Sequence, residues 1–337
     1  MRFLRGRDEP NAEISYEPFW EWWGGARDRI ARAIAEQTLP AVVDEISRNV
    51  HALDGRLAWE LSKGTKAEHA LIVTPEGNPE IRPLALRWAD SAPPSDATWE
   101  YHSSRQAGPL GTLGIDGVDV SLADFRAIAG WDANRERLDV RLWHPALLEA
   151  PPQSRYQIAY LFLDNLLGED AVERWIGEIE ILDLETGGRT PDELKAEVER
   201  QAAGATGQAW VLAQATDHRG NPVLLTVNRA LKPIDRPFNQ TLVIVTVDRG
   251  IEQLANSPES AELEAAEDRL TEALETVGGV YVGRVTERRR RRIFAMCPDA
   301  ARAKDVAEGW ARAERRFGPS LEVRPDPGWK FRVELGL

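Results

Sequence analysis

Residues 278–297 read GGVYVGRVTERRRRRIFAMC and decide how the C-terminal part of the chain folds. Two apolar runs, Val280–Val285 and Arg292–Met296, flank a charged stretch, and this pattern predicts a β-hairpin. The run of five arginines, Arg288–Arg292, falls at the turn. Alternation along the strands would place successive arginine side chains on opposite faces of the ribbon. The segment therefore predicts two neighbouring antiparallel strands with a strongly basic tip.

The segments on either side of this hairpin predict a regular order of elements. The expected elements are a strand at Leu242–Val247, a helix from Pro258 to Val277, a helix from Ala300 to Phe317, and strands at Leu321–Arg324 and Phe331–Leu335. With the hairpin in the middle, the order is β-α-β-β-α-β. This is the ferredoxin-like arrangement, an antiparallel sheet with both helices on one face. A further hairpin, Ala209–Ala215 with Pro222–Val227, is expected to precede it.

The N-terminal part predicts two helices followed by a mixed body of strands and helices. Apolar residues recur every three or four positions over Phe19–Glu36 and again from Pro40 to Leu53, so two helices are expected to pack as a hairpin. The following elements are strands at Leu57–Leu61, Ala70–Val73, Trp99–His102, Phe125–Trp131, Leu138–Trp143 and Ile176–Leu182, and helices at Leu84–Ala89 and Ser154–Leu167. Glycines at positions 108, 111, 114 and 117 predict a loop.

A connector is expected between the two parts. Thr190, Pro191 and Glu193 have the spacing of a capping box with proline in the first helical turn, so a short helix is expected there. The sequence therefore predicts an α+β protein with an N-terminal domain at residues 1–185, a linker at 186–206 and a ferredoxin-like domain at 207–337. Whether the N-terminal domain is a diverged copy of the C-terminal one stays open.

Composition and charge exclude several classes of function. The chain has 337 residues, a net charge of −13 and a single cysteine, Cys297. Before Gly207 there are 22 basic and 36 acidic residues, and from Gly207 onward 20 basic and 19 acidic, so the charges are −14 and +1. An acidic chain disfavours general binding to nucleic acid or to an anionic membrane, whereas a basic protein surface is allowed. With no signal peptide and no apolar run of membrane-spanning length, a cytoplasmic location is expected.

The C-terminal stretch also resembles a known family. The segments that carry the resemblance are Gly278–Thr286, Arg291–Ala295 and Asp326–Phe331. They resemble the strand pair and the closing tryptophan-containing strand of the bacterial family called domain of unknown function 695, over residues 207–337. A more distant similarity connects the same pattern to regulator of ribonuclease E activity B, a ferredoxin-like inhibitor that binds an enzyme. The resemblance implies a fold and, by analogy, a binding role, and no catalytic residues carry over from it.

Motifs for common chemistry are missing from the sequence. The five histidines are never closer than 18 positions apart, a single cysteine cannot build a thiolate zinc site, and no calcium loop is present. No phosphate-binding loop and no G-x-S-x-G elbow occurs. Cys297 is expected to be a buried, inert thiol, with activation by the following helix as the alternative. No cofactor or metal is expected.

Three residues are the candidates for a ligand pocket in the N-terminal domain. Tyr101 and Arg105 belong to the polar run Tyr101–Arg105, and alternation places them on the same face of a strand. His144 follows a strand directly before Pro145 and could point into a cleft. The alternatives are an ordinary sheet edge for the first two residues and a capping or packing role for His144.

Charge segregation in the C-terminal domain suggests a second candidate site. The arginines Arg288, Arg289, Arg290, Arg291 and Arg292 would bind phosphate or carboxylate groups. The preceding helix carries Glu264, Glu267 and Asp268 on an acidic face, which would dock a basic protein surface or the arginine hairpin of another copy. In both cases the alternative is a solvated surface.

These patterns together favour a non-catalytic protein-binding or regulatory module. The competing class is an enzyme or small-ligand binder with a pocket around Tyr101, Arg105 and His144.

Overall fold

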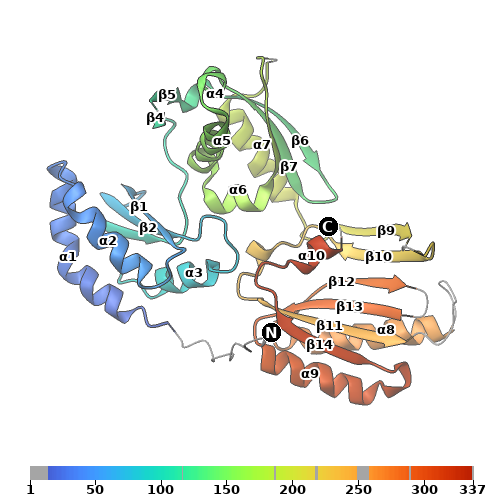
Figure 1. Ribbon diagram of the computed structural model, residues 1–337. Helices are drawn as coiled ribbons and strands as arrows, with labels where there is room; N and C mark the ends of the chain where they lie inside the picture. The colour runs from blue at the N-terminus through green and yellow to red at the C-terminus, as the bar shows by residue number, and fades with distance from the viewer. Residues whose placement is uncertain are drawn as a thin grey trace, which may run out of the picture. The chain divides into compact units, whose positions relative to one another are not determined.

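The computed structural model describes residues 14–115, 117–185, 187–216, 219–248, 258–287 and 290–335 (Figure 1). The protein has a mixed α+β fold with several sheets, as the sequence predicts. It forms two compact units, one comprising the chain up to Glu76 with Ile81–Arg105, the other comprising Gly77–Glu80 with Gln106–Leu337. The division at residues 186–206 stays a prediction.

The first unit packs two helices against a small sheet. Helices α1 (Glu17–Ala35) and α2 (Pro40–His51) form the expected hairpin. The other elements of this unit are β1 (Ala58–Lys63), β2 (His69–Thr74), α3 (Arg82–Asp90) and β3 (Trp99–His102). The three strands form a sheet in the order β1-β2-β3, with β1 and β2 antiparallel and β3 parallel to β2. The indole rings of Trp23, Trp88 and Trp99 are buried in this core, and the partly buried Trp20, Trp22 and Trp59 pack against it.

The second unit begins with a three-stranded sheet that has helices on one face. Its elements are β4 (Thr112–Ile115), β5 (Val118–Ser121), β6 (Arg126–Asp132), β7 (Arg137–Trp143), α4 (Pro145–Glu149), α5 (Pro152–Leu167), α6 (Glu169–Trp175), β8 (Ile176–Ile181) and α7 (Pro191–Gly204). Strand β7 lies between β6 and β8. The expected loop at the glycines is instead the short β4–β5 hairpin, whose partly buried Leu113, Ile115 and Val118 pack against the core.

The connector helix α7 is built as its sequence predicts. Thr190 accepts the backbone N–H of Glu193, and the Glu193 carboxylate accepts the N–H of Thr190, which completes the capping box. Leu194 and Val198 on α7 are buried in the same core as Phe162 of α5. Packing therefore joins this helix to the three-stranded sheet.

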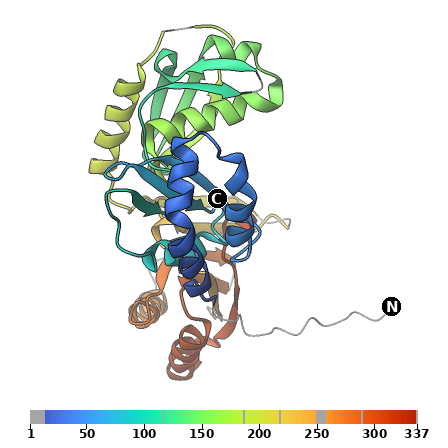
Figure 2. The ribbon, with the colours of Figure 1, turned by 90° about the vertical axis from the view of Figure 1, so that its left-hand side faces the viewer.

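The C-terminal part of the second unit is a six-stranded sheet with order β14-β11-β13-β12-β10-β9, and every pair in it is antiparallel. Its elements are β9 (Trp210–Thr216), β10 (Pro222–Asn228), β11 (Thr241–Asp248), α8 (Pro258–Glu275), β12 (Val280–Glu287), β13 (Arg290–Cys297), α9 (Ala300–Ala313) and β14 (Ser320–Pro325), with single 3-10 turns at Pro233–Asp235 and Arg315–Phe317. A further 3-10 turn, Leu122–Asp124, precedes β6 in the three-stranded part. Leu270 of α8 and Ala307 of α9 share a core with Val245 and Ile293 of the sheet. Both helices therefore cover one face, and Figure 2 shows them side by side.

The end of the chain differs from its prediction. Phe331–Leu335 was expected to be a strand, but it begins the helical turn α10 (Phe331–Glu334). The Asp326 carboxylate accepts the N–H groups of Lys330 (2.7 Å) and Phe331 (2.9 Å), which curls the backbone back on itself. Phe331 is buried against Phe294 on the sheet face opposite α8 and α9, whereas Val333 is 78% exposed. The alternation of apolar residues is real, but only Phe331 is fully buried, while Leu335 is partly buried against the same core.

Candidate functional site

A hollow of about 500 Å³ lies in the second unit at the start of β9. Its wall combines the end of helix α6, the chain entering β9, the turn after β10, the C-terminal half of α8 and the start of β12. The lining residues are Arg174, Thr206, Gly207, Gln208, Trp210, Asn228, Leu231, Asp235, Arg236, Thr271, Glu275, Val280 and Tyr281. We call this the β9 hollow.

Two aromatic rings form one wall of the β9 hollow. The indole of Trp210 stacks on the ring of Tyr281 with centroids 5.4 Å apart and planes at 26°. The Trp210 Nε1–H donates to Gln208 Oε1 (2.8 Å), and the side chain remains 43% exposed. A stacked and half-exposed indole offers apolar area with little loss of conformational entropy on binding.

Two arginines supply positive charge to the same hollow. Arg174 is fixed by Asp235, which accepts from its Nε, and by the cation–π contact with Trp175 (4.2 Å to the ring centroid). Its buried Nη1 has no hydrogen-bond partner. Arg236 is exposed and, within the described residues, makes no ion pair. One guanidinium is therefore held in place and the other is accessible to an anion.

A buried lysine lies behind the hollow. Lys232 is 4% exposed, and its Nζ donates to the backbone carbonyls of Arg135 (2.9 Å) and Ala230 (3.0 Å). Burial, reinforced by the nearby charges of Arg174 and Arg137, lowers the pKa of Lys232 to about 7. Burial and neighbouring arginines likewise lower the pKa of Arg332 to about 10. Like charges are thus concentrated in a poorly solvated layer.

The strand entering the hollow is anchored by a buried carboxylate. Glu136 is 6% exposed and has a positive φ of 46°. Its carboxylate accepts the N–H groups of Thr206 (2.9 Å) and Gly207 (3.1 Å). These contacts fix the chain three residues before Trp210 and so set where β9 begins.

The arginine hairpin and the acidic helix meet inside the chain. Glu267 of α8 is 3% exposed, and its carboxylate accepts from Arg291 (3.0 Å), Arg284 (3.1 Å) and the hydroxyl of Tyr281 (2.8 Å). The prediction that Glu267 belongs to an exposed docking face is therefore wrong. Position 267 lies four residues after Leu263, on the apolar stripe of the helix, and that signal was available in the sequence.

The other residues of these charged groups lie nearer the surface. Arg290 is exposed, and Arg292 pairs with Glu287 (2.7 Å), while Arg288 and Arg289 lie outside the described residues. Glu264 keeps a side-chain exposure of 52% with Arg284 at 3.8 Å, and Asp268 is exposed. Docking of a basic surface on the helix stays a prediction for these two carboxylates.

The three residues expected to line a pocket fall in different units. Tyr101 lies in the first unit, where its hydroxyl accepts from Trp23 Nε1 (2.9 Å) and burial raises its pKa. Arg105 of the same unit pairs with Glu60 (3.0 Å) and Glu76 (3.1 Å).

His144 belongs to the second unit and is 3% exposed. Its Nδ1 accepts the N–H of Ala146 (3.1 Å) as the cap of α4, and its Nε2 lies 3.0 Å from the Ser121 carbonyl. This places the proton on Nε2, and burial lowers the pKa of the imidazole. Both ring nitrogens are engaged in structural hydrogen bonds.

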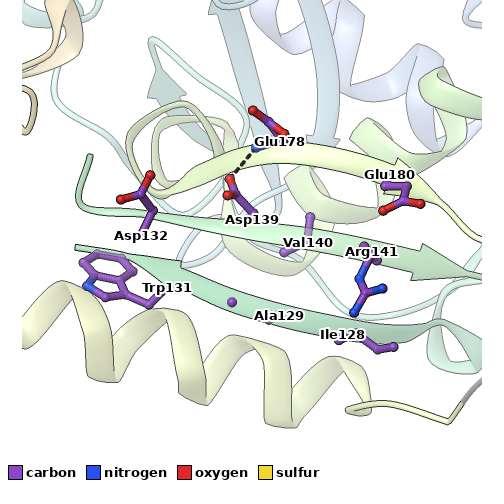
Figure 3. A pocket seen from close by; sticks show the side chains of 10 residues that line it. Ile128, Ala129, Trp131, Asp132, Asp139, Val140, Arg141, Glu178 and Glu180 are labelled. Atoms are coloured by element: carbon purple, nitrogen blue, oxygen red, sulfur yellow. Dashed lines mark hydrogen bonds between the residues drawn. The ribbon is translucent and has the colours of Figure 1, made fainter. Parts of the chain in front are cut away.

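A second hollow, of about 450 Å³, lies on the sheet face of β6, β7 and β8 away from the helices (Figure 3). Asp139 on β7 and Glu178 on β8 lie beside each other there, and Asp139 Oδ1 accepts the Glu178 N–H (2.8 Å). Arg135 pairs with Asp139 (2.7 Å) and with Asp132. Across the part of the chain that the structure describes, no group of three or more His, Cys, Asp or Glu side chains is arranged to hold a metal ion. The face is an ion-paired, acidic surface.

Comparison of the chain with protein-family models, with curated proteins and with solved structures finds no match in any of the three. None of the helices in the described ranges is long and apolar enough to cross a membrane.

Proposed function

We propose that the protein is a non-catalytic protein-binding module that adds a strand of its partner to the free edge of β9. The observation that carries the proposal is the composition of this edge. β9 ends the strand order, and its seven residues, WVLAQAT, include no charged side chain and no proline. Trp210 and Leu212 are 43% and 72% exposed. Edge strands that avoid association are usually short, charged or interrupted by proline, and β9 has none of these features.

The backbone of β9 supports the same proposal. The Arg229 N–H donates to the Ala209 carbonyl (2.9 Å), so this pair is hydrogen-bonded across the hairpin. Hydrogen-bonded positions alternate along an antiparallel pair. The N–H and C=O groups of Trp210, Leu212, Gln214 and Thr216 therefore point away from β10. They form the template that strand addition needs.

The proposed architecture is ferredoxin-like, extended by one hairpin. The order β14-β11-β13-β12 and the two helices on one face support this assignment, and β10 with β9 continue the sheet beyond β12. Membership of the domain of unknown function 695 family remains part of the proposal and rests on the sequence resemblance alone. Binding would give the protein a regulatory role, because pairing with β9 would order a segment of the partner.

The experiment compares two lysine substitutions in the full chain. Leu212→Lys places a charge on the β9 edge, whereas Leu184→Lys changes an equally exposed leucine (75%) outside any strand. Proteins retained from lysate by the wild type and by Leu184→Lys, but lost with Leu212→Lys, support the proposal. Equal retention by the wild type and both variants contradicts it. Circular dichroism checks that both variants are folded.

A further inference from the structure

The β9 edge leads directly into the β9 hollow, and this continuity restricts what binds there. Trp210 is the first residue of β9 and also lines the hollow. A strand added antiparallel to β9, the orientation of every pair in this sheet, would run from Thr216 toward Trp210. Its C-terminal end would then enter the hollow.

The charges at this end favour an anion. The hollow and the layer behind it combine the cations Arg137, Arg174, Lys232, Arg236 and Arg332 with the carboxylates Glu136, Asp235 and Glu275. Glu136 and Asp235 are already occupied by backbone N–H groups and by Arg174. Glu275 lies on the α8 side of the hollow and is exposed. Arg236 is the exposed cation of the set, and guanidinium groups bind carboxylates with two parallel hydrogen bonds.

We infer that the occupant of β9 is the C-terminal segment of a partner protein, bound antiparallel to β9 with its terminal carboxylate at Arg236 and its last apolar side chain against Trp210. This inference rests on the proposed strand addition and names the chemistry of its partner. Main-chain hydrogen bonds to Leu212 and Gln214 would supply the pairing. The carboxylate would fix the register, because it ends the strand at a defined residue.

The test uses a fluorescein-labelled probe peptide, two lysines followed by six alternating threonine and valine residues, made with a free C-terminal carboxylate or with an amide. Binding to the full chain is followed by fluorescence anisotropy at low salt. The acid should bind about 1.5- to 5-fold more tightly than the amide, the usual effect of a single exposed ion pair. Arg236→Gln should remove the difference, and Arg302→Gln, an exposed arginine on α9, should leave it unchanged.

The outcomes separate this inference from the function on which it rests. If acid and amide bind equally and both are lost with Leu212→Lys, strand addition stands and the carboxylate site is refuted. If neither peptide binds, or if Leu212→Lys has no effect on binding, the proposed function fails and the inference fails with it. Sedimentation provides a further check. A dimer that Leu212→Lys dissociates would make a second copy the occupant and would overturn the inference.

Discussion

The six-stranded sheet has two edges, and they are built differently. The β14 edge carries Glu322 and Arg324, which pair at 3.0 Å, and it ends in Pro325. The β9 edge has seven uncharged residues and exposes Trp210 and Leu212. Charges and proline are the usual protection of an edge strand against pairing with another chain. One edge of this sheet therefore carries this protection, and the other lacks it.

Charged residues are distributed unevenly across this sheet. Between α8 and the centre of the sheet, Glu267 of α8 pairs with Arg284 of β12 and Arg291 of β13. At β14 the charges face solvent. Along β9 charge is absent, whereas the β9 hollow at the start of the strand is lined by Arg174, Asp235, Arg236 and Glu275.

The largest change in the free energy of unfolding is expected when the buried ion pairs of Glu267 are removed. Glu267→Ala leaves Arg291 buried without its carboxylate, and loss of one partner from a buried ion pair costs about 3–5 kcal/mol in the free energy of unfolding. The matched control is Glu264→Ala, because this side chain is half exposed, and a change of under about 0.5 kcal/mol is expected for it. Urea denaturation measures both. Equal losses of unfolding free energy in the two variants would show that the buried ion pairs of Glu267 do not stabilise the domain.

The next effect concerns the pH dependence of stability that the buried Lys232, behind the β9 hollow, produces. The pKa of Lys232 is about 7 in the folded protein, against 10.5 for an ordinary, solvated lysine. The folded state therefore binds fewer protons between these values, and stability rises with pH across this window, at a limit of about 1.4 kcal/mol per pH unit. Denaturation from pH 7 to pH 10 should lose this slope in Lys232→Met and keep it in Lys304→Met. An unchanged slope in Lys232→Met would mean that another group titrates.

A smaller effect is expected when the protected edge is opened. Glu322→Thr with Arg324→Thr removes the charges from β14 and gives it a composition closer to that of β9. Weak, concentration-dependent association is expected in sedimentation velocity, and adding Lys at Ser320, an exposed β14 position, should reverse it. A variant that sediments as the wild type does at every concentration would show that charge is not what protects β14.

The smallest effect concerns only the solvent accessibility of two thiols, one buried on β13 and one introduced on β9. Burial raises the pKa of Cys297 to about 11, and this thiol on β13 is fully buried. In native Gln214→Cys, iodoacetamide at pH 8 should label about one thiol, that of β9, with stability unchanged within about 0.5 kcal/mol. Mass spectrometry counts the labels. Labelling of Cys297 at a similar rate would contradict the packing of β13.

Much of the fold follows from local patterns in the sequence. The strand and helix order of the C-terminal sheet follows from hydrophobic periodicity, and the capping box at Thr190 and Glu193 is a local hydrogen-bond pattern that the structure confirms. The alternation of Phe331–Leu335 predicts a strand, and this prediction is wrong because the Asp326 carboxylate, five residues before Phe331, caps a helical turn instead. Such a cap depends on a turn that periodicity does not describe.

The candidate site was harder to predict, for a physical reason. The sequence predicts the β9–β10 hairpin, but strand order is decided by long-range pairing, so the position of β9 at an edge could not be derived. Lys232 and Arg174 are 58 positions apart and come together only through folding. The absence of charge in Trp210–Thr216 is visible in the sequence. It indicates an unprotected edge only in combination with the position of β9 at the end of the sheet.

Strand addition at β9 can be observed by hydrogen–deuterium exchange on the full chain, with and without a purified partner whose binding depends on Leu212. Exchange is expected to slow over residues 210–216 and to stay unchanged over residues 320–325, because only the β9 edge gains a strand. Slower exchange over α8 or β14, with residues 210–216 unchanged, would contradict strand addition at β9.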